Sequence, residues 1–301
     1  MIKTVFKFFQ NRNFILISAL IFAFLFPGGG EYLSEYTVYI LALVMSFSTT
    51  GINFKMLTDL KSVSKVTIES VLLNFVIHGI IILVLAYFFV DKSAFYGFVV
   101  IAATPPGVAI IPFTYTFNGD LDYSFKGILG TYLLSIIITP LIISFFADDT
   151  GLNREVLVFL IIKIIIIPLI ISRLLLLKKI FPLVEKIRGK VVDYGFALII
   201  YTAVALNYDL ILSDQKTVFI SALILFTAIF ISGVLMLILK RKTKNKKLMI
   251  SKNLMLTIKG SGFAIATTLI LFDQSSAVPA AVMSIMVLLY LITLNIYYHR
   301  K

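Results

Sequence analysis

The sequence contains no cysteine, only two histidines and few charged residues, which make up 14% of its 301 positions. Without cysteine the chain has no means of forming disulfides, thiolate metal sites or a cysteine-dependent active site. Two histidines are too few for most metal sites, and we find neither a Ser/His/Asp grouping nor a phosphate-binding motif. These absences argue against an enzyme, and we expect no metal and no other cofactor.

Apolar residues make up 60% of the chain, compared with about 45–50% in soluble domains. Apolar stretches of about 17–25 residues recur along the chain, and each is long enough to cross the roughly 30 Å hydrocarbon core of a bilayer. We therefore expect an all-α polytopic membrane protein with ten transmembrane helices in a single domain, residues 1–301. The approximate spans are 14–28, 37–53, 63–90, 95–117, 123–147, 155–177, 192–212, 217–240, 250–272 and 276–298.

The distribution of lysine and arginine orients these spans. With the N-terminus inside, 21 of the 27 basic residues fall on cytoplasmic segments and three on outer ones, which follows the positive-inside rule. We expect a multi-pass protein of the inner or plasma membrane with both termini cytoplasmic. The basic segment 1–13 has no small-residue cleavage site after it, so we expect a retained first helix. The net charge of +12 then reflects topology, and no nucleic acid partner is expected.

Two spans are interrupted near their middle. Residues 101–112 read IAATPPGVAIIP, where Pro105 and Pro106 remove backbone donors and Pro112 is expected to repeat the break one turn later. Residues 259–262 read KGSG. Within a bilayer such backbone is tolerated where protein or a water-filled cavity surrounds it. The alternative is that these are two unrelated kinks, since proline is common in membrane helices.

The two breaks lie about 155 residues apart, close to half the chain, which suggests two inverted five-helix repeats of about 1–150 and 151–301. Matching interrupted helices are a pointer to a transporter's binding site near the membrane midplane. We expect the substrate to be bound by the residues of both breaks, namely Thr104, Pro105, Pro106, Gly107, Lys259, Gly260, Ser261 and Gly262.

Four segments resemble the bile acid:sodium symporter family. They are ALVMSFSTTGINFKMLTDL (42–60), VLLNFVIHG (71–79), TPPGVAIIPFTYTFNGDLDYS (104–124) and KGSGFAIATTLILFDQSSAVPAAVMSIM (259–286). The resemblance implies an inverted-repeat transporter with a panel domain (helices 1, 2, 6 and 7) and a core domain (helices 3–5 and 8–10). In that fold the unwound centres of helices 4 and 9 cross.

The sequence departs from this family at the positions of the sodium ligands. The resemblance keeps an amide at Asn74 and a hydroxyl at Ser124. It places apolar residues or a cation where the family has oxygen ligands, at Ile110, Ile111, Ile128, Met255 and Lys259. A fixed ammonium would repel Na⁺ and could replace it electrostatically. Sodium is therefore not the expected coupling ion, and a proton is possible.

Lys259 allows two interpretations. It lies about eight residues, roughly 12 Å, into its span, so it could extend to the cytoplasmic surface or face the break. Facing the break, and exchanging between charged and neutral forms, it would couple proton movement to transport. Asn74 and His78 share one helix face. We assign proton or ion coupling to Asn74, His78, Ser124 and Lys259, with interhelical hydrogen bonding as the alternative for Asn74 and His78.

Other polar residues within spans have simpler explanations. Asp122 and Lys126 are spaced to form an ion pair. Lys163 either faces substrate or extends outward, and Asn207 with Asp209 either lines an outer vestibule or ends a helix.

The combined prediction is a secondary active transporter that moves a small organic solute, anionic or amphipathic, by alternating access. One alternative is a sodium-coupled symporter of the bile acid type with altered sites. Another is a membrane sensor or a channel, although no selectivity-filter repeat is visible. The expected partners are the solute and the lipid bilayer.

Overall fold

The computed structural model describes residues 12–50, 59–107, 109–147, 155, 159, 162–272 and 275–299. Every element in these ranges is helical, which confirms the predicted all-α class. Five helices are long and apolar enough to cross a membrane, and four more apolar helices have 10–17 residues. The five are Leu60–Phe89, Leu121–Phe146, Phe181–Leu206, Gln215–Lys242 and Ser275–Tyr298.

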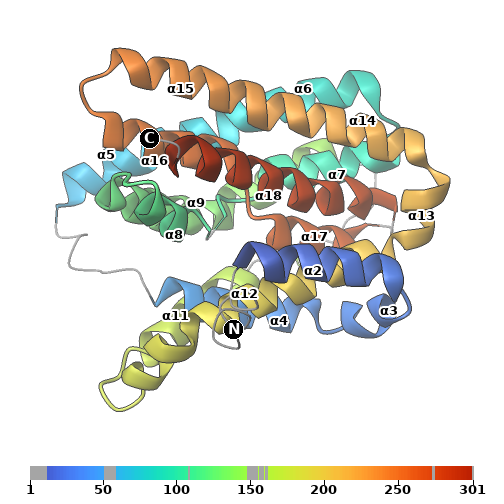
Figure 1. Cartoon of the computed structure of the whole chain (residues 1–301), viewed down its shortest axis with the longest axis horizontal. Helices are drawn as coiled ribbons and strands as arrows, with labels where there is room; N and C mark the ends of the chain where they lie inside the picture. The colour runs from blue at the N-terminus through green and yellow to red at the C-terminus, as the bar shows by residue number, and fades with distance from the viewer. Residues whose placement is uncertain are drawn as a thin grey trace.

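The helices form two layers, which are separated in the lower and upper parts of Figure 1. In the smaller layer, α12 packs against α2, α3 and α4, and α11 packs against α4. We call this group the small layer. Its elements are α2 (Arg12–Leu25), α3 (Gly29–Ser34), α4 (Thr37–Thr49), the π-helical turn η4 (Ile162–Ile166), α11 (Ile167–Leu174) and α12 (Phe181–Leu206).

The remaining helices form the large layer, which is linked to α12 by α13 (Tyr208–Ser213). The first half of this layer consists of α5 (Leu60–Val71), η2 (Leu72–His78), α6 (Gly79–Phe89), α7 (Lys92–Ala103), α8 (Ile110–Thr116) and α9 (Leu121–Phe146). The second half consists of α14 (Gln215–Phe226), η5 (Thr227–Ile231), α15 (Ser232–Lys242), α16 (Lys246–Thr257), α17 (Ser261–Leu271), η6 (Ser275–Ala277) and α18 (Val278–His299).

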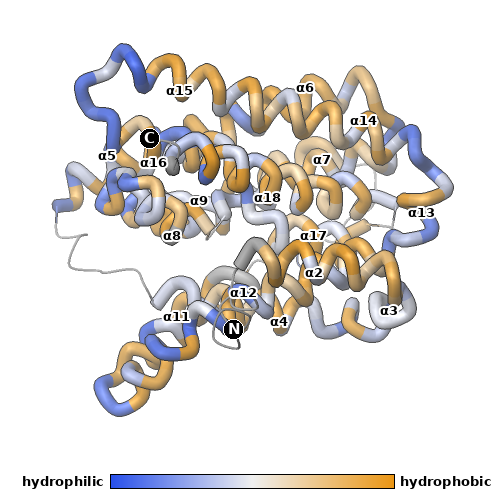
Figure 2. Tube along the Cα trace, in the orientation of Figure 1, coloured by the Kyte–Doolittle hydropathy of each residue, from blue (hydrophilic) through white to orange (hydrophobic). Residues whose placement is uncertain are grey.

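Hydrophilic residues gather at the two ends of the molecule, with an apolar zone between them (Figure 2). The α11–α12 and α15–α16 connections lie at one end, on the left of the view, and the α13–α14 connection lies at the other. Many large apolar side chains on the outside of this zone are exposed, among them Phe22, Tyr87 and Phe145. Such a surface is suited to lipid rather than to water.

Two sequence predictions about helix boundaries are wrong. Helix α12 begins at Phe181, so Lys186 and Lys190 lie within a helix and not in a loop before residue 192. The proline near its start suits a first helical turn, and the charged turns that follow extend beyond the apolar stretch. Pro112 is the third residue of α8 and does not interrupt it, because first-turn amides need no helical acceptor. Predictions for residues 1–11, 51–58 and 148–154 lie outside the described residues.

Side-chain caps define the start of five helices. The carboxylates of Asp59, Asp91, Asp120 and Asp214 each accept a hydrogen bond from a backbone amide three residues later. Asn245 caps α16 in the same way. These caps satisfy amides that have no partner within the helix.

The Asp214 cap makes a testable contribution to stability at low pH. Hydrogen bonds from the side chain and backbone of Thr217 hold the pKa of the Asp214 carboxyl below its ordinary value. This stabilisation is present above the pKa of the unfolded chain and is lost as pH falls through the lower pKa of the folded state. We expect Asp214→Ala to cost about 0.5–1 kcal/mol near neutral pH. Asp214→Asn should retain most of the cap and remove its pH dependence, as measured by thermal unfolding between pH 7 and pH 3.

Candidate functional site

The two breaks meet and pair through their backbones. Pro106 and Lys259 form an isolated antiparallel bridge. On one side of it the Gly107 amide donates to the Ile258 carbonyl at 3.0 Å, and on the other the Gly260 amide donates to the Pro105 carbonyl at 2.9 Å. Helix α7 stops before the prolines because a residue preceding proline avoids helical angles, and Thr104 is extended. This pairing gives hydrogen-bond partners to backbone amides and carbonyls that a continuous helix would have bonded internally.

Glycine permits this close approach. A Cβ atom on Gly107 would lie 2.9 Å from the Lys259 carbonyl oxygen and 3.2 Å from Ile258 Cγ2. A Cβ atom on Gly260 would lie 3.3 Å from the Pro105 carbonyl oxygen. The predicted role of the two glycines in the breaks therefore has a direct steric reason. We call the paired segment, residues 104–107 with 258–260, the crossing.

Lys259 turns into the protein at the crossing and does not extend to the surface. Its side chain is 1% exposed. Nζ donates to Asn74 Oδ1 at 3.0 Å and to the carbonyl oxygens of Ala102 and Thr104, each at 2.9 Å. It also lies 5.1 Å from the centre of the Phe75 ring. Of the two interpretations of Lys259, the one in which it extends to the cytoplasm is thus wrong for this structure.

The geometry around Nζ suits an ammonium group. An ammonium has three donors and no acceptor, and three oxygens surround it. A neutral amine has two donors and would leave one of these buried oxygens without a hydrogen bond. The nearby aromatic ring also favours a cation. No carboxylate among the described residues pairs with Lys259, so an ammonium at this position is compensated by neutral oxygens alone.

Asn74, the amide that the family resemblance keeps, links Lys259 to α16. It lies in the π-helical turn η2, fully buried, and its Nδ2 donates to the Met255 carbonyl at 3.2 Å. Single π-turns within α-helices often occur at functional sites. His78 ends the same turn and is buried, and its Nδ1 has no hydrogen-bond partner among the described residues. Asn74 and His78, for which one shared helix face was predicted, are both buried, whereas their roles stay predictions.

The other positions of the expected sodium ligands form an apolar cluster. Ile110, Ile128 and Met255 are fully buried in the core. Ser124 Oγ is hydrogen-bonded to Thr114 Oγ1 at 2.9 Å. The described residues contain no group of three or more histidine, cysteine or acidic side chains that could hold a metal ion. The structure thus places the lysine amine at one end of the family's ligand set and apolar side chains at the other.

A narrow hollow of about 50 Å³ adjoins the crossing, between the small and large layers. It is smaller than the roughly 300–1,000 Å³ of a typical ligand pocket, so a small organic solute needs the two layers to move apart here. Lys259 is the one charged residue of its described lining, and its ammonium points away into the oxygens described above. The lining consists of Leu16, Gly107, Ala109, Phe113, Phe196, Ile200, Ile258, Lys259, Gly260, Ser261, Ser284, Val287, Leu288 and Leu291.

The structure brings some predicted substrate-binding residues to the hollow and not others. Gly107, Lys259, Gly260 and Ser261 line it. The hydroxyl of Thr104 instead donates to the Val100 carbonyl of its own helix at 2.7 Å. Pro105 and Pro106 form the crossing without being part of the lining, and Gly262 belongs to the first turn of α17.

Several lining residues were missed because they are apolar and sit in ordinary helices. Leu16, Phe113, Phe196 and Ile200 have no polar group or unusual spacing that marks them. Ser284 has a hydroxyl, which bonds the Ala280 carbonyl at 3.3 Å. Contacts between layers, rather than any motif, determine which of these side chains face the hollow.

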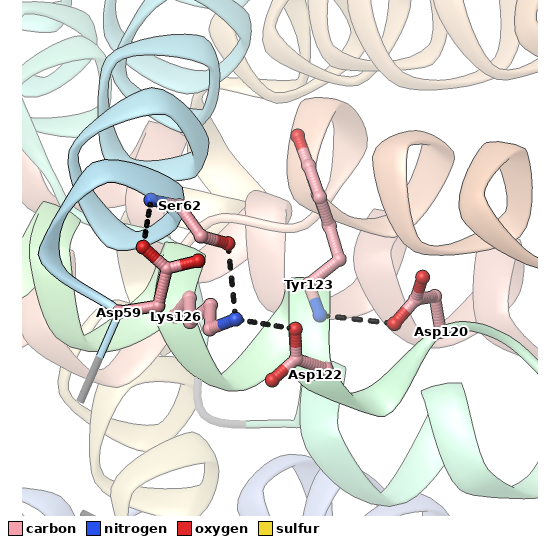
Figure 3. A network of polar contacts seen from close by, with 6 residues as sticks. All are labelled: Asp59, Ser62, Asp120, Asp122, Tyr123 and Lys126. Atoms are coloured by element: carbon pink, nitrogen blue, oxygen red, sulfur yellow. Dashed lines mark hydrogen bonds and ion pairs between the residues drawn. The ribbon is translucent and has the colours of Figure 1, made fainter. Parts of the chain in front are cut away.

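The remaining polar residues lie away from the hollow. Lys126 donates to Asp122 at 2.6 Å, as predicted, and also to the Ser62 hydroxyl at 3.1 Å (Figure 3). The backbone amide of Ser62 also donates to Asp59 at the start of α5. The bond between Lys126 and Ser62 thus links α9 to α5. Nearby, Glu69 pairs with Lys252 of α16.

Lys163 and Asn207 also find local explanations. Lys163 Nζ lies 5.1 Å from the centre of the Phe159 ring, and the residue is half-buried in η4. Asn207 is the residue that ends α12, and its Nδ2 donates to the Ala203 carbonyl at 2.8 Å. Asp209 is exposed in α13.

Comparison with known proteins tests the resemblance independently. No curated protein sequence matches the chain. A family model described as the Sodium Bile acid symporter family matches residues 38–245, which is more than two thirds of the chain. The match begins in α4 and extends through α15, so it includes the first break and the amide-bearing turn η2. These findings confirm the predicted family, and the chain belongs to the sodium bile acid symporter family.

Proposed function

We propose that this membrane transporter moves a small amphipathic organic anion by alternating access and without sodium coupling. The observation that carries the proposal is the ammonium of Lys259, held by Asn74 Oδ1 and two backbone carbonyls beside the hollow. Because this amine is covalently attached, it stays close to these oxygens at any sodium concentration. An external Na⁺ ion would have to displace it.

The proposal includes an arrangement of ten spans in two inverted repeats, with both termini in the cytoplasm. In this arrangement α7 with α8, and α16 with α17, are the two broken spans. The small layer would be the panel and the large layer the core that moves against it. The basic α11–α12 and α15–α16 connections support a cytoplasmic position for the end of the molecule that they share.

The charge of the solute follows from the uncompensated ammonium. A negative group in the hollow, roughly 8–10 Å from Nζ, would gain about 2 kcal/mol at an effective dielectric constant near 20. The α17 N-terminus beside the crossing adds positive potential of the same sign. The rest of the lining is mostly apolar, with Phe113, Phe196 and Ile200 as its large members, and suits a hydrocarbon body.

Uptake into proteoliposomes tests this function. We expect a radiolabelled bile acid, or a smaller aliphatic carboxylate, to enter at rates that agree within about twofold in sodium and in potassium buffers. Lys259→Met should reduce the rate about tenfold, since the attraction for the anion is lost. Lys163→Met is the matched control, because this lysine also lies in an apolar helix but does not line the hollow.

Three outcomes decide between the alternatives. A sodium-dependent rate in the unsubstituted protein would contradict the proposal and favour the sodium-coupled symporter. Uptake driven by a pH gradient would assign proton coupling to Lys259 or His78. Rapid, non-saturating flux of many ions would favour a channel.

A further inference from the structure

A second hollow lies between the same two layers, on the other side of the crossing. It has a volume of about 240 Å³, and its lining includes Glu35, Val38, Leu206, Ala266 and Ile270. Both hollows touch α12 and α17, but at different levels. On α17, Ser261 lines the first and Ala266 the second, which corresponds to about 7.5 Å along the helix axis.

A thin contact separates the two hollows. Gly262 follows Ser261 and faces the small layer, where a Cβ atom would lie 3.4 Å from Ile199 Cδ1 and 3.5 Å from Leu41 Cδ1. Both of these side chains are buried. Leu41 lies one helical turn beyond Val38, which lines the second hollow, and Ile199 precedes Ile200, which lines the first. The contact is apolar, and Gly262 lies between the residues of α17 that line the two hollows.

We propose that the second hollow is the opposite mouth of the solute route, and that the contact of Gly262 with Leu41 and Ile199 is the barrier between the two mouths. Closure at this point needs a residue without a side chain, so that α17 can lie directly on α4 and α12. When the layers separate here, the second hollow becomes continuous with the crossing. The proposal rests on the transport cycle proposed above, but not on the charge of the solute or on the coupling ion.

The absence of cysteine makes this barrier accessible to a direct test. Ala266→Cys places a single thiol at a buried position of the second hollow, and Ala109→Cys places one in the first. Modification by a membrane-impermeant maleimide is followed in the full-length, detergent-solubilised protein. Gly262→Leu should prevent closure and raise the rate at Ala266→Cys about tenfold, while the rate at Ala109→Cys falls.

Two matched variants separate the barrier from general loosening. Gly262→Ala adds a methyl group at ordinary contact distance, so the rates should stay within about twofold. Combining Gly262→Leu with Ile199→Ala provides space for the new side chain and should restore the original rates. If Gly262→Leu does not fold, Leu41→Ala with Ile199→Ala thins the barrier and should raise the rate at Ala266→Cys by itself.

The labelling rates give a clear decision. Unchanged rates in a folded Gly262→Leu protein, or equal increases at both thiols without rescue by Ile199→Ala, would overturn the barrier. Because no solute is added, failure of anion uptake or the discovery of sodium coupling would leave these rates unaffected. The two proposals can therefore fail separately.

Discussion

Lys259→Gln is expected to create a sodium-dependent stability that the unsubstituted protein lacks. Removal of the ammonium leaves Asn74 Oδ1 and the carbonyl oxygens of Ala102 and Thr104 arranged around a vacated position. Glutamine supplies a further amide oxygen at a position where the family resemblance places an oxygen ligand. Hard cations bind such neutral and carbonyl oxygens.

The expected size of this effect follows from ligand linkage. At a sodium concentration ten times the dissociation constant, the folded state gains about 1.4 kcal/mol. That corresponds to about 2 °C in melting temperature for a chain of this size. Circular dichroism during heating, in sodium chloride and in choline chloride of equal ionic strength, measures it. Lys163→Gln provides the control and should show no difference between the salts.

Equal stability of the Lys259→Gln protein in the two salts would contradict this prediction. If Lys259→Gln folds but melts at the same temperature in both salts, the three oxygens do not form a cation site. Lys259 would then be a buried structural lysine, and its charge would no longer account for the loss of sodium coupling.

Gly97→Ala is expected to destabilise the protein by about 3 kcal/mol through overpacking. Gly97 lies in α7, and a Cβ atom there would overlap the backbone carbonyl of Ser276 and lie 3.2 Å from Pro279 Cδ. A backbone atom cannot move aside as a flexible side chain can. Because α7 also carries the Ala102 and Thr104 carbonyls that hold Lys259, its displacement should disturb the crossing.

Gly189→Ala is the matched control for this substitution. Gly189 also lies within a helix, α12, and a Cβ atom there would meet nothing within 4 Å. Alanine is the better helix former, so this variant should gain about 0.5–1 kcal/mol. A melting temperature for Gly97→Ala equal to that of the unsubstituted protein would show that α7 and η6 do not pack as described.

The crossing could be predicted from the sequence because its causes are local. Pro105, Pro106 and Gly107 make a helix unfavourable, and Gly260 does the same in the second break. The family resemblance implied that the two breaks cross, and the bridge between Pro106 and Lys259 shows that they do. The start of α12 was placed too late in the sequence because its first turns are charged. Hydropathy detects only the apolar part of the helix that follows them.

The environment of Lys259 could not be predicted in the same way. Two of its three hydrogen-bond acceptors are backbone carbonyls, those of Ala102 and Thr104, and any residue type could provide them. Asn74 was identified through its amide, but its contact with Lys259 joins residues 185 positions apart. The hollow is similarly a product of packing between layers, so apolar residues such as Phe196 and Leu288 carried no signal.

The most direct test of the account is the binding of radioactive ²²Na⁺ to the purified protein at equilibrium. The account predicts no saturable binding to the unsubstituted protein, because the ammonium of Lys259 occupies the available oxygens. It predicts saturable binding in Lys259→Gln. Saturable sodium binding by the unsubstituted protein would contradict the central claim that the lysine has replaced the ion.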